Sequence, residues 1–466
     1  MKKLTLAVAA LLAGCSIPDS RPVITPKAAP DLALTGAPAP AIDATWWRAF
    51  GDPQLDRVVN DVLAGNPSLD EALARVQQAQ AVLSQQRSGA APNVSADINP
   101  QVARLSGVYE IPPPYAGTVR FLGTAQASLS YDLDLFGRQR AAIETARQSL
   151  RATALDLTAA RLMLAGSAVQ TYLDVVRAER QAAIARSTIT ARQGTVRLVQ
   201  VRIRNQLSSK LDLEAATTLL AQAREALVQA EGSRVLATNA LAALAGRGAD
   251  YPATIGPAAM KLDAAPALPA AIPADLLARR ADVAAAQARI AAALSGRQEA
   301  RRAFYPNINL NALAGLQAIG LGNFFSLDAA TVGVGPAVHL PIFDAGRLRA
   351  QLAGATAGVD LATATYNDTV VGAVREAADA LARIASIDRQ RAQQREVVRG
   401  YAETGRLNNI RVRSGLESRL DLVDNDIRLL DAQLADANLM TDAAVARVQL
   451  VLALGGGFDP SQDASR

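Results

Sequence analysis

The sequence has almost none of the residues from which catalytic and metal-binding sites are built. Among 466 residues there is one cysteine, Cys15, and one histidine, His339. One cysteine allows no internal disulfide, and this inventory cannot supply a cluster of metal ligands. No nucleophile–base set and no phosphate-binding loop is recognisable. These absences predict that the protein is not an enzyme and that it binds no cofactor. His339 is expected to be a polar side chain that faces the interior of a barrel.

Aromatic residues are scarce as well, at 4% of the chain, although half of the residues are apolar. Alanine dominates, and Glu, Gln, Arg and Leu fill most of the rest, which is typical of long helices rather than of an aromatic-rich core. The formal net charge is only +5, and arginines alternate with acidic and amide residues, as on a solvated helix face. Without a basic cluster carrying interleaved aromatics, we expect no nucleic acid partner.

The N-terminus is interpreted as a sorting signal, with residues 1–14 as the signal peptide. Lys2 and Lys3 precede a short apolar run, too short to span a membrane as a stable helix. Leu12-Ala13-Gly14-Cys15 resembles a bacterial lipobox, which implies cleavage before Cys15 and a covalent lipid on that residue. An ordinary secretory signal with an incidental cysteine is the alternative. Residues 15–44, rich in proline and alanine, are then a lipidated, extended tether.

Proline is absent between Pro114 and Pro252 and again between Pro341 and Pro460. Proline inside a helix costs about 3 kcal/mol, so these gaps permit long helices. Apolar residues within both gaps recur in steps of three and four, as on helices that pack against partners. We predict helices at about 141–205, 210–245, 347–410 and 418–454, joined as antiparallel hairpins in an elongated protein.

Four segments alternate apolar and polar residues with a period of two, which predicts strands with one apolar and one polar face. They are residues 93–102, 124–135, 307–316 and 331–342. Each is about ten residues long, which suffices to cross a bilayer at a tilt. Open strand edges are not tolerated in hydrocarbon, and four strands cannot close a barrel. If these strands lie in a membrane, oligomerisation is therefore required, and three protomers would supply twelve strands.

The two halves of the chain repeat one another. Residues 201–216 read VRIRNQLSSKLDLEAA, and residues 410–425 read IRVRSGLESRLDLVDN, with matching positions 209 apart. We expect these segments to be the two hairpin tips. The first repeat is predicted at 45–255 and the second at 256–455, the latter with a helix at about 273–303, followed by a C-terminal tail at 456–466.

Five collinear motifs, together with the lipobox, resemble the TolC/OprM/NodT family of outer-membrane efflux channel lipoproteins over essentially the whole chain. The motifs are Trp46–Asp56, Asn66–Leu69, Tyr131–Arg138, Ile272–Val283 and Leu340–Arg347. The family usually has proline where Ala281 stands, a small departure at a helix start.

The resemblance implies a mixed α and β, TolC-like fold. A homotrimer would form a twelve-strand barrel in the outer membrane of a Gram-negative bacterium, continued by a periplasmic α-helical tunnel. Its partners would be a periplasmic adaptor (membrane fusion) protein and an inner-membrane pump, expected to be of the RND type. The chain would passively conduct small molecules outward. A structural or adhesive coiled-coil lipoprotein is the alternative, and it leaves the polar strand faces unexplained. The cargo stays open among antibiotics, aromatic compounds, metals and siderophores.

The resemblance also assigns roles to the tips. The expected adaptor contacts are Arg202, Arg204, Leu207, Ser209, Leu211, Arg411, Arg413, Leu416 and Ser418; alternatively, these residues only cap and close the coiled coil. Leu420 and Asp424 match the family residues that constrict the periplasmic end, where a ring of carboxylates would form a gate. The family arginine three positions later is Ile427 here, followed by Arg428. Asp424 is alternatively an exposed helix residue.

Overall fold

The computed structural model describes residues 20–34, 42–108, 111–264, 269, 271–273, 275–416 and 418–459. The predicted signal peptide, Cys15 and most of the C-terminal tail lie outside these residues. The chain divides into two compact units, each built from both halves of the sequence. The sheet unit comprises Arg75–Thr153 and Ala285–Tyr366 with the described residues up to Pro26. The hairpin unit comprises Lys27–Ala74, Ala154–Ala284 and Asn367–Arg466, as far as it is described.

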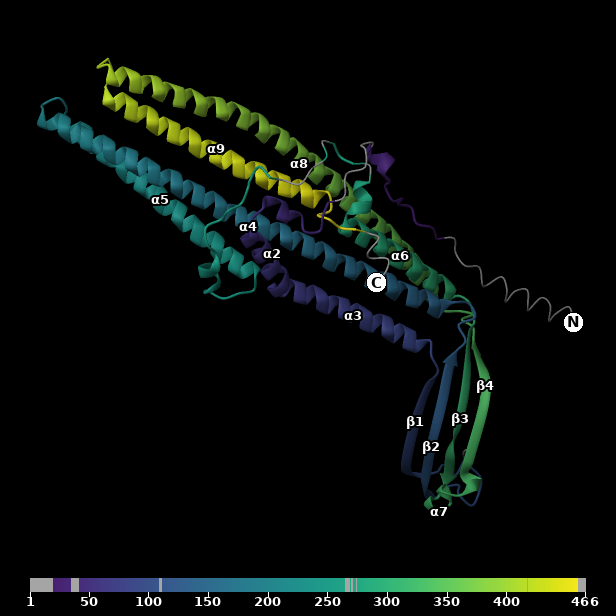
Figure 1. Ribbon diagram of the computed structural model, residues 1–466. Helices are drawn as coiled ribbons and strands as arrows, with labels where there is room; N and C mark the ends of the chain where they lie inside the picture. Colours follow the sequence, from purple (N-terminus) through teal and green to yellow (C-terminus); the bar gives the residue numbers. More distant parts are fainter. Residues whose placement is uncertain are drawn as a thin grey trace. The chain divides into compact units, whose positions relative to one another are not determined.

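The sheet unit contains one antiparallel sheet in the order β1-β2-β3-β4 (Figure 1). Its strands are β1 (Asn93–Arg104), β2 (Val119–Asp132), β3 (Asn307–Ile319) and β4 (Ala330–His339). The partner of β1 is β2 alone and that of β4 is β3 alone, so both outer strands have an open edge within the described chain.

Two strands end earlier than their alternation predicts. The second strand ends at Asp132 rather than at 135, because Asp134 has a positive φ of 43° and its carboxylate accepts the backbone N–H groups of Gln139 and Arg140. The fourth ends at His339 rather than at 342, where Pro341 follows without an N–H for the ladder. The carboxylate of Asp344 likewise accepts the backbone N–H of Leu348. After both β2 and β4, an aspartate that accepts backbone N–H groups therefore marks the start of the helix that follows the strand.

Two hairpins of equal dimensions carry most of the helical residues. Helices α4 (Arg138–Arg204) and α8 (Arg347–Arg413) each have 67 residues, and α5 (Lys210–Leu244) and α9 (Arg419–Ala453) each have 35. Within the hairpin unit, α4 packs against α5 through Arg234–Glu179 and against α9 through Arg177–Asp442. The remaining pair, α8 and α9, is joined by the amide of Gln394, which donates to the carbonyl of Ala432.

Shorter helices complete the two halves: α2 (Pro53–Gly65), α3 (Pro67–Gly89), α6 (Ala281–Arg302) and α7 (Leu321–Phe324). The helix predicted at 273–303 is wrong at its start, since a 3-10 turn occupies Leu276–Arg279 and Arg280 is extended. The Arg280 guanidinium binds Asp282, Glu376 and the carbonyl of Ala453, which holds this residue out of the helix.

The largest apolar core lies in the hairpin unit. Trp46, Trp47 and Phe50 precede α2 and pack with its buried face onto α4, around Tyr172 and Leu173. In the described part of the chain, no helix has the length and hydropathy needed to cross a membrane.

Candidate functional site

The strand register sorts the sheet into one polar and one apolar face. Ser95 lies opposite Ser128 with their hydroxyl oxygens 3.1 Å apart, and Ser130 lies opposite both Asn93 and Asn311. The other polar-face residues include Asp97, Asn99, Thr124, Gln126, Asn307, Asn309, Gln317, Thr331 and His339. His339 thus lies on the polar face, opposite Asn307.

The opposite face carries large apolar side chains that are exposed in the single chain. Ile98 is 72% exposed, Val332 83% and Val334 78%. Such a continuous apolar surface must be covered by another apolar phase or by protein. The sheet is therefore amphipathic, with a polar face suited to water and an apolar face suited to lipid or to protein.

The first tip closes α4 with a Schellman motif. The N–H of Gln206 donates to the carbonyl of Ile203, and the N–H of Leu207 donates to that of Arg202 at 2.8 Å. The guanidinium of Arg202 donates back to the carbonyl of Leu207. Leu207 itself is left 67% exposed.

A capping box then starts α5. The hydroxyl of Ser209 accepts the backbone N–H of Asp212, while the Asp212 carboxylate accepts the N–H of Ser209 at 2.8 Å. These hydrogen bonds, first the backbone one from Ser209 and then those from the hydroxyls of Ser209 and Ser208, lower the pKa of Asp212.

The second tip repeats the Schellman motif at the matching positions. The N–H of Gly415 donates to the carbonyl of Val412, and the N–H of Leu416 donates to that of Arg411 at 2.9 Å. Ser418 caps α9 by accepting the N–H of Leu420. Leu416 is 72% exposed. Figure 1 shows both tips at the same end of the hairpin unit.

The predicted tip residues fall into two groups. Ser209, Ser418 and Arg202 form the internal hydrogen bonds described above, and Arg411 is engaged in an interaction of its own. The residues of the other group are all exposed: Arg204, Leu207, Leu211, Arg413 and Leu416. The guanidinium groups of its two arginines have no partner among the described residues. The second group is the surface available to a partner.

The predicted gate residues lie on the first turns of α9. Leu420 is half-buried, and Asp424 is exposed, with no hydrogen bond or ion pair in the described chain. Ile427 is only 4% exposed and points into a cavity between α4, α5 and α9 that Ile184 and Leu219 also line. Asn425 fixes this turn to α8, because its amide donates to the carbonyl of Tyr401.

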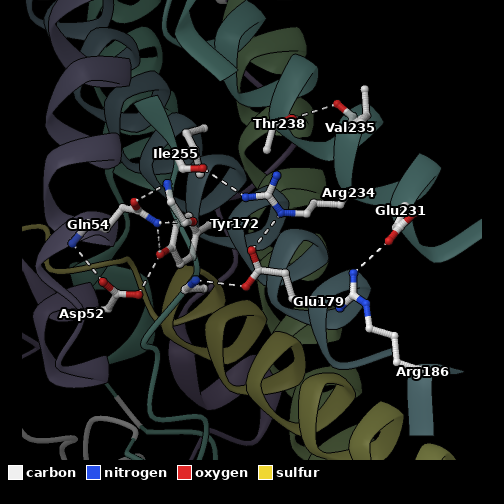
Figure 2. Close-up of polar contacts among 12 residues, drawn as sticks. Asp52, Gln54, Tyr172, Glu179, Arg186, Glu231, Arg234, Val235, Thr238 and Ile255 are labelled. Atoms are coloured by element: carbon white, nitrogen blue, oxygen red, sulfur yellow. Dashed lines mark hydrogen bonds and ion pairs between the residues drawn. The ribbon is translucent and has the colours of Figure 1, made fainter. Parts of the chain in front are cut away.

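A buried polar network, which the sequence patterns do not reveal as a set, fixes the tryptophan segment to α4 (Figure 2). The Tyr172 hydroxyl donates to Asp52 at 2.7 Å and accepts from the Gln54 amide at 2.9 Å. Burial, and then the Asp52 carboxylate, raise the pKa of Tyr172. Asp52 also accepts the N–H of Ala259. Only the Asp52-Pro53 pair, typical of a helix start, marks this site in the sequence.

In the same network, Glu179 on α4 joins α5 to the chain that follows it (Figure 2). Its carboxylate accepts Arg234 at 2.9 Å and the N–H of Ala258 at 3.0 Å, while Arg234 donates to the carbonyl of Ile255. The described residues contain no group of three or more His, Cys, Asp or Glu that would hold a metal ion. Through these hydrogen bonds the network connects α2, α4, α5 and the segment that follows α5.

Comparison with known proteins gives consistent matches. The family model described as outer membrane efflux protein matches residues 58–247 and 272–456. The fusaric acid resistance protein FusA of Burkholderia cepacia is 36% identical over 366 residues, which cover 76% of this chain and 69% of FusA. The outer membrane protein OprJ of Pseudomonas aeruginosa is 32% identical over 438 residues, 90% of this chain and 88% of OprJ. The crystal structure of the outer membrane protein VceC of Vibrio cholerae matches with a TM-score of 0.82 at 30% identity, over 90% of this chain and 100% of VceC.

Proposed function

The chain belongs to the outer membrane efflux protein family, and from this premise we propose that three copies of it form one conduit through the outer membrane. The resemblance identified from the five motifs is confirmed, and so is the TolC-like fold. The protein is an outer-membrane efflux channel and a transporter rather than an enzyme. The adhesive alternative has no support from these relatives.

The observation that supports a trimer is that the sheet has two unpaired edges. Strands β1 and β4 each have one unpaired edge, and hydrocarbon does not tolerate such edges. Joining β4 of one protomer to β1 of the next removes every edge, and three protomers supply the twelve strands of a closed barrel. The exposed valines and isoleucines then face lipid, and the Ser, Asn and Gln face lines the lumen.

The two tips provide the proposed docking surface for a periplasmic adaptor protein. Leu207 and Leu416 are exposed at equivalent positions. Arg204 and Arg413 lie nearby in the sequence, and their exposed guanidinium groups have no partner within the described ranges. Because each protomer carries two such tips, a trimer would offer six quasi-equivalent sites. The adaptor would connect the conduit to an inner-membrane pump, for which we retain the RND type as a proposal. The matching tips also support the proposal that the chain arose by internal duplication.

Two further assignments from the sequence remain proposals. Leu420 and Asp424 would narrow the periplasmic end. Asp424 is exposed and has no ion-pair partner among the residues that the structure describes, as a cation-binding ring requires. A lipid on Cys15 would anchor the N-terminus to the outer membrane, each buried methylene contributing about 0.8 kcal/mol. Cys15→Ser should abolish labelling by a radioactive fatty acid, and persistent labelling would refute the assignment. For cargo we propose small organic molecules, as the naming of FusA for fusaric acid resistance suggests.

The proposed conduit is tested by measuring the conductance of two variants, each with one cysteine introduced on β2. Gln126→Cys places a thiol on the polar face, and Ala127→Cys places one on the apolar face. The purified protein should be a trimer in detergent and should conduct ions in planar bilayers. A charged methanethiosulfonate reagent should reduce the current of the Gln126→Cys channel alone, with the parent protein as the baseline for Cys15. Monomers without conductance, or equal block of both variants, would contradict the proposal.

A further inference from the structure

A cavity of about 570 Å³ lies in the sheet unit where strands give way to helices. Its wall is formed by the turn between β2 and α4, the end of α6, the first residue of β3, the end of β4 and the first turn of α8. This volume is within the range of small-molecule sites, about 300–1,000 Å³. None of the tip residues contributes to it.

The cavity borders the polar face of the sheet. Asn307 and His339 line it, and they face one another across β3 and β4 in the polar register. If the polar face lines the lumen, as the proposed function requires, the cavity opens into the conduit. The inference that follows rests on that function.

Basic groups outnumber the acidic groups in the wall. The guanidinium groups are those of Arg138, Arg302 and Arg347, with His339 as a further base. The nearest contact between Arg138 and a carboxylate, that of Asp132, is 3.4 Å long. Arg347 donates to the amide oxygen of Gln351, also at 3.4 Å, and its guanidinium forms no other hydrogen bond or ion pair within the described residues. Since each guanidinium carries five N–H donors, most of the donors stay available.

The two acidic groups in the wall oppose an anion only weakly. The oxygens of Asp134 already accept the backbone N–H groups of Gln139 and Arg140 and the Arg140 guanidinium. The Glu299 side chain is half-buried and forms no hydrogen bond within the described part of the chain. Burial raises its pKa, and the nearby Arg138 opposes this shift. A bound anion would therefore meet more free donors than competing charges.

The wall also contains a flat aromatic surface. The rings of Phe136 and Tyr305 stack with centroids 5.0 Å apart and an interplanar angle of 9°. Both residues line the cavity, and Tyr305 is 41% exposed. Tyr305 therefore offers ring surface against which a planar ligand can pack close to the arginines.

We propose that this cavity is a contact site for aromatic carboxylates on their way through the conduit. The carboxylate would accept hydrogen bonds from Arg347 and Arg138, and the ring system would pack against Tyr305. Guanidinium groups suit this role because their planar fork matches a carboxylate.

The test uses 2-naphthoate as the probe, with neutral 2-naphthamide as its isostere. In planar bilayers, 2-naphthoate should block the open channel reversibly and 2-naphthamide should not. Arg347→Gln should weaken the block about tenfold, the loss of roughly one charge-assisted hydrogen bond. Arg349→Gln is the matched control, since Arg349 is exposed two residues further along α8 and does not line the cavity. Glu299→Gln should tighten the block about threefold by removing the opposing charge.

Calorimetric titration of the detergent-solubilised trimer with both probes supplies a readout that needs no current. Binding of 2-naphthoate, weakened by Arg347→Gln and unchanged by Arg349→Gln, would support the site. Equal effects of the two arginine variants, equal binding of the two probes, or normal currents without block would overturn it. Failure of the proposed function would look different, because no current would then be seen in any variant.

Discussion

Gln206 and Gly415 occupy the same position in the two tips, and both have a positive φ, 59° and 72° respectively. Each donates its N–H to a carbonyl three residues earlier. A left-handed conformation carries a penalty of about 1–2 kcal/mol for residues with a Cβ and none for glycine. The first tip therefore stores strain that the second tip avoids.

Gln206→Gly should relieve this strain and stabilise the first tip by about 1 kcal/mol. Hydrogen exchange of the Leu207 amide, whose hydrogen bond closes the motif, would report the change as slower exchange. Gln206→Ala is the control, because alanine keeps a Cβ and should bring no gain. In the second tip, Gly415→Gln should make the Leu416 amide exchange faster. Faster exchange of the Leu207 amide in Gln206→Gly would show that the first tip is not strained.

The cap of α5 should depend on pH in a known direction. The pKa of Asp212 is lowered by hydrogen bonds from Ser209 and Ser208, so the folded tip favours the ionised carboxylate. The stabilisation is thus fully present above the ordinary pKa of about 3.9 and is lost as the pH falls through the lowered value. Protection factors of the first-turn amides of α5, which correct for the intrinsic pH dependence of exchange, should fall below about pH 4, and Asp212→Asn should remove this fall. An unchanged acid profile in the asparagine variant would disprove the cap as its cause.

Adaptor binding should separate the two groups of tip residues. Leu207→Ser combined with Leu416→Ser removes exposed apolar surface without touching a hydrogen bond, and should weaken binding to the cognate adaptor at least tenfold, about 1.4 kcal/mol. Surface plasmon resonance would measure this. Leu361→Ser, at a position that is 70% exposed on α8 outside the tip, should bind normally. Unchanged affinity of the double variant would leave the tips as structural caps only.

Tyr172→Phe should destabilise the hairpin unit by about 1–3 kcal/mol, because the buried Asp52 carboxylate loses its 2.7 Å hydrogen bond. Thermal unfolding of the full-length protein would show this as a lower midpoint. Tyr305→Phe should leave the midpoint unchanged, since the Tyr305 hydroxyl forms no hydrogen bond within the described chain. Similar shifts in both variants would argue against a role for the network.

Much of the architecture follows from local patterns. Absence of proline and a period of three to four place the ends of α4, α5, α8 and α9 within a few residues, and strict alternation identifies both sheet faces. These features depend on neighbours in sequence, so one chain is enough to read them. Where a side chain competes with the backbone, the pattern fails, as at Asp134 for the end of β2 and at Arg280 for the start of α6.

Some of the candidate sites can likewise be predicted from the sequence, and others cannot. The tips are visible because the chain repeats them, and Ser209 and Ser418 carry the helix-start signal. The cavity is invisible in the sequence, because Arg138, Tyr305 and Arg347 are brought together only by the sheet and the helices that follow it. The Tyr172–Asp52 contact spans a similarly long separation.

The open edges of β1 and β4 set a condition for biogenesis. The hairpin unit has its own apolar core, whereas the sheet unit leaves valines, isoleucines and two strand edges uncovered in the single chain, and in the proposed trimer only neighbouring protomers cover these edges. Sheet closure should therefore be a bimolecular or higher-order step whose rate rises with protein concentration. Chains that have not yet assembled would need a chaperone in the aqueous compartment, because their open strand edges could otherwise pair incorrectly with other chains.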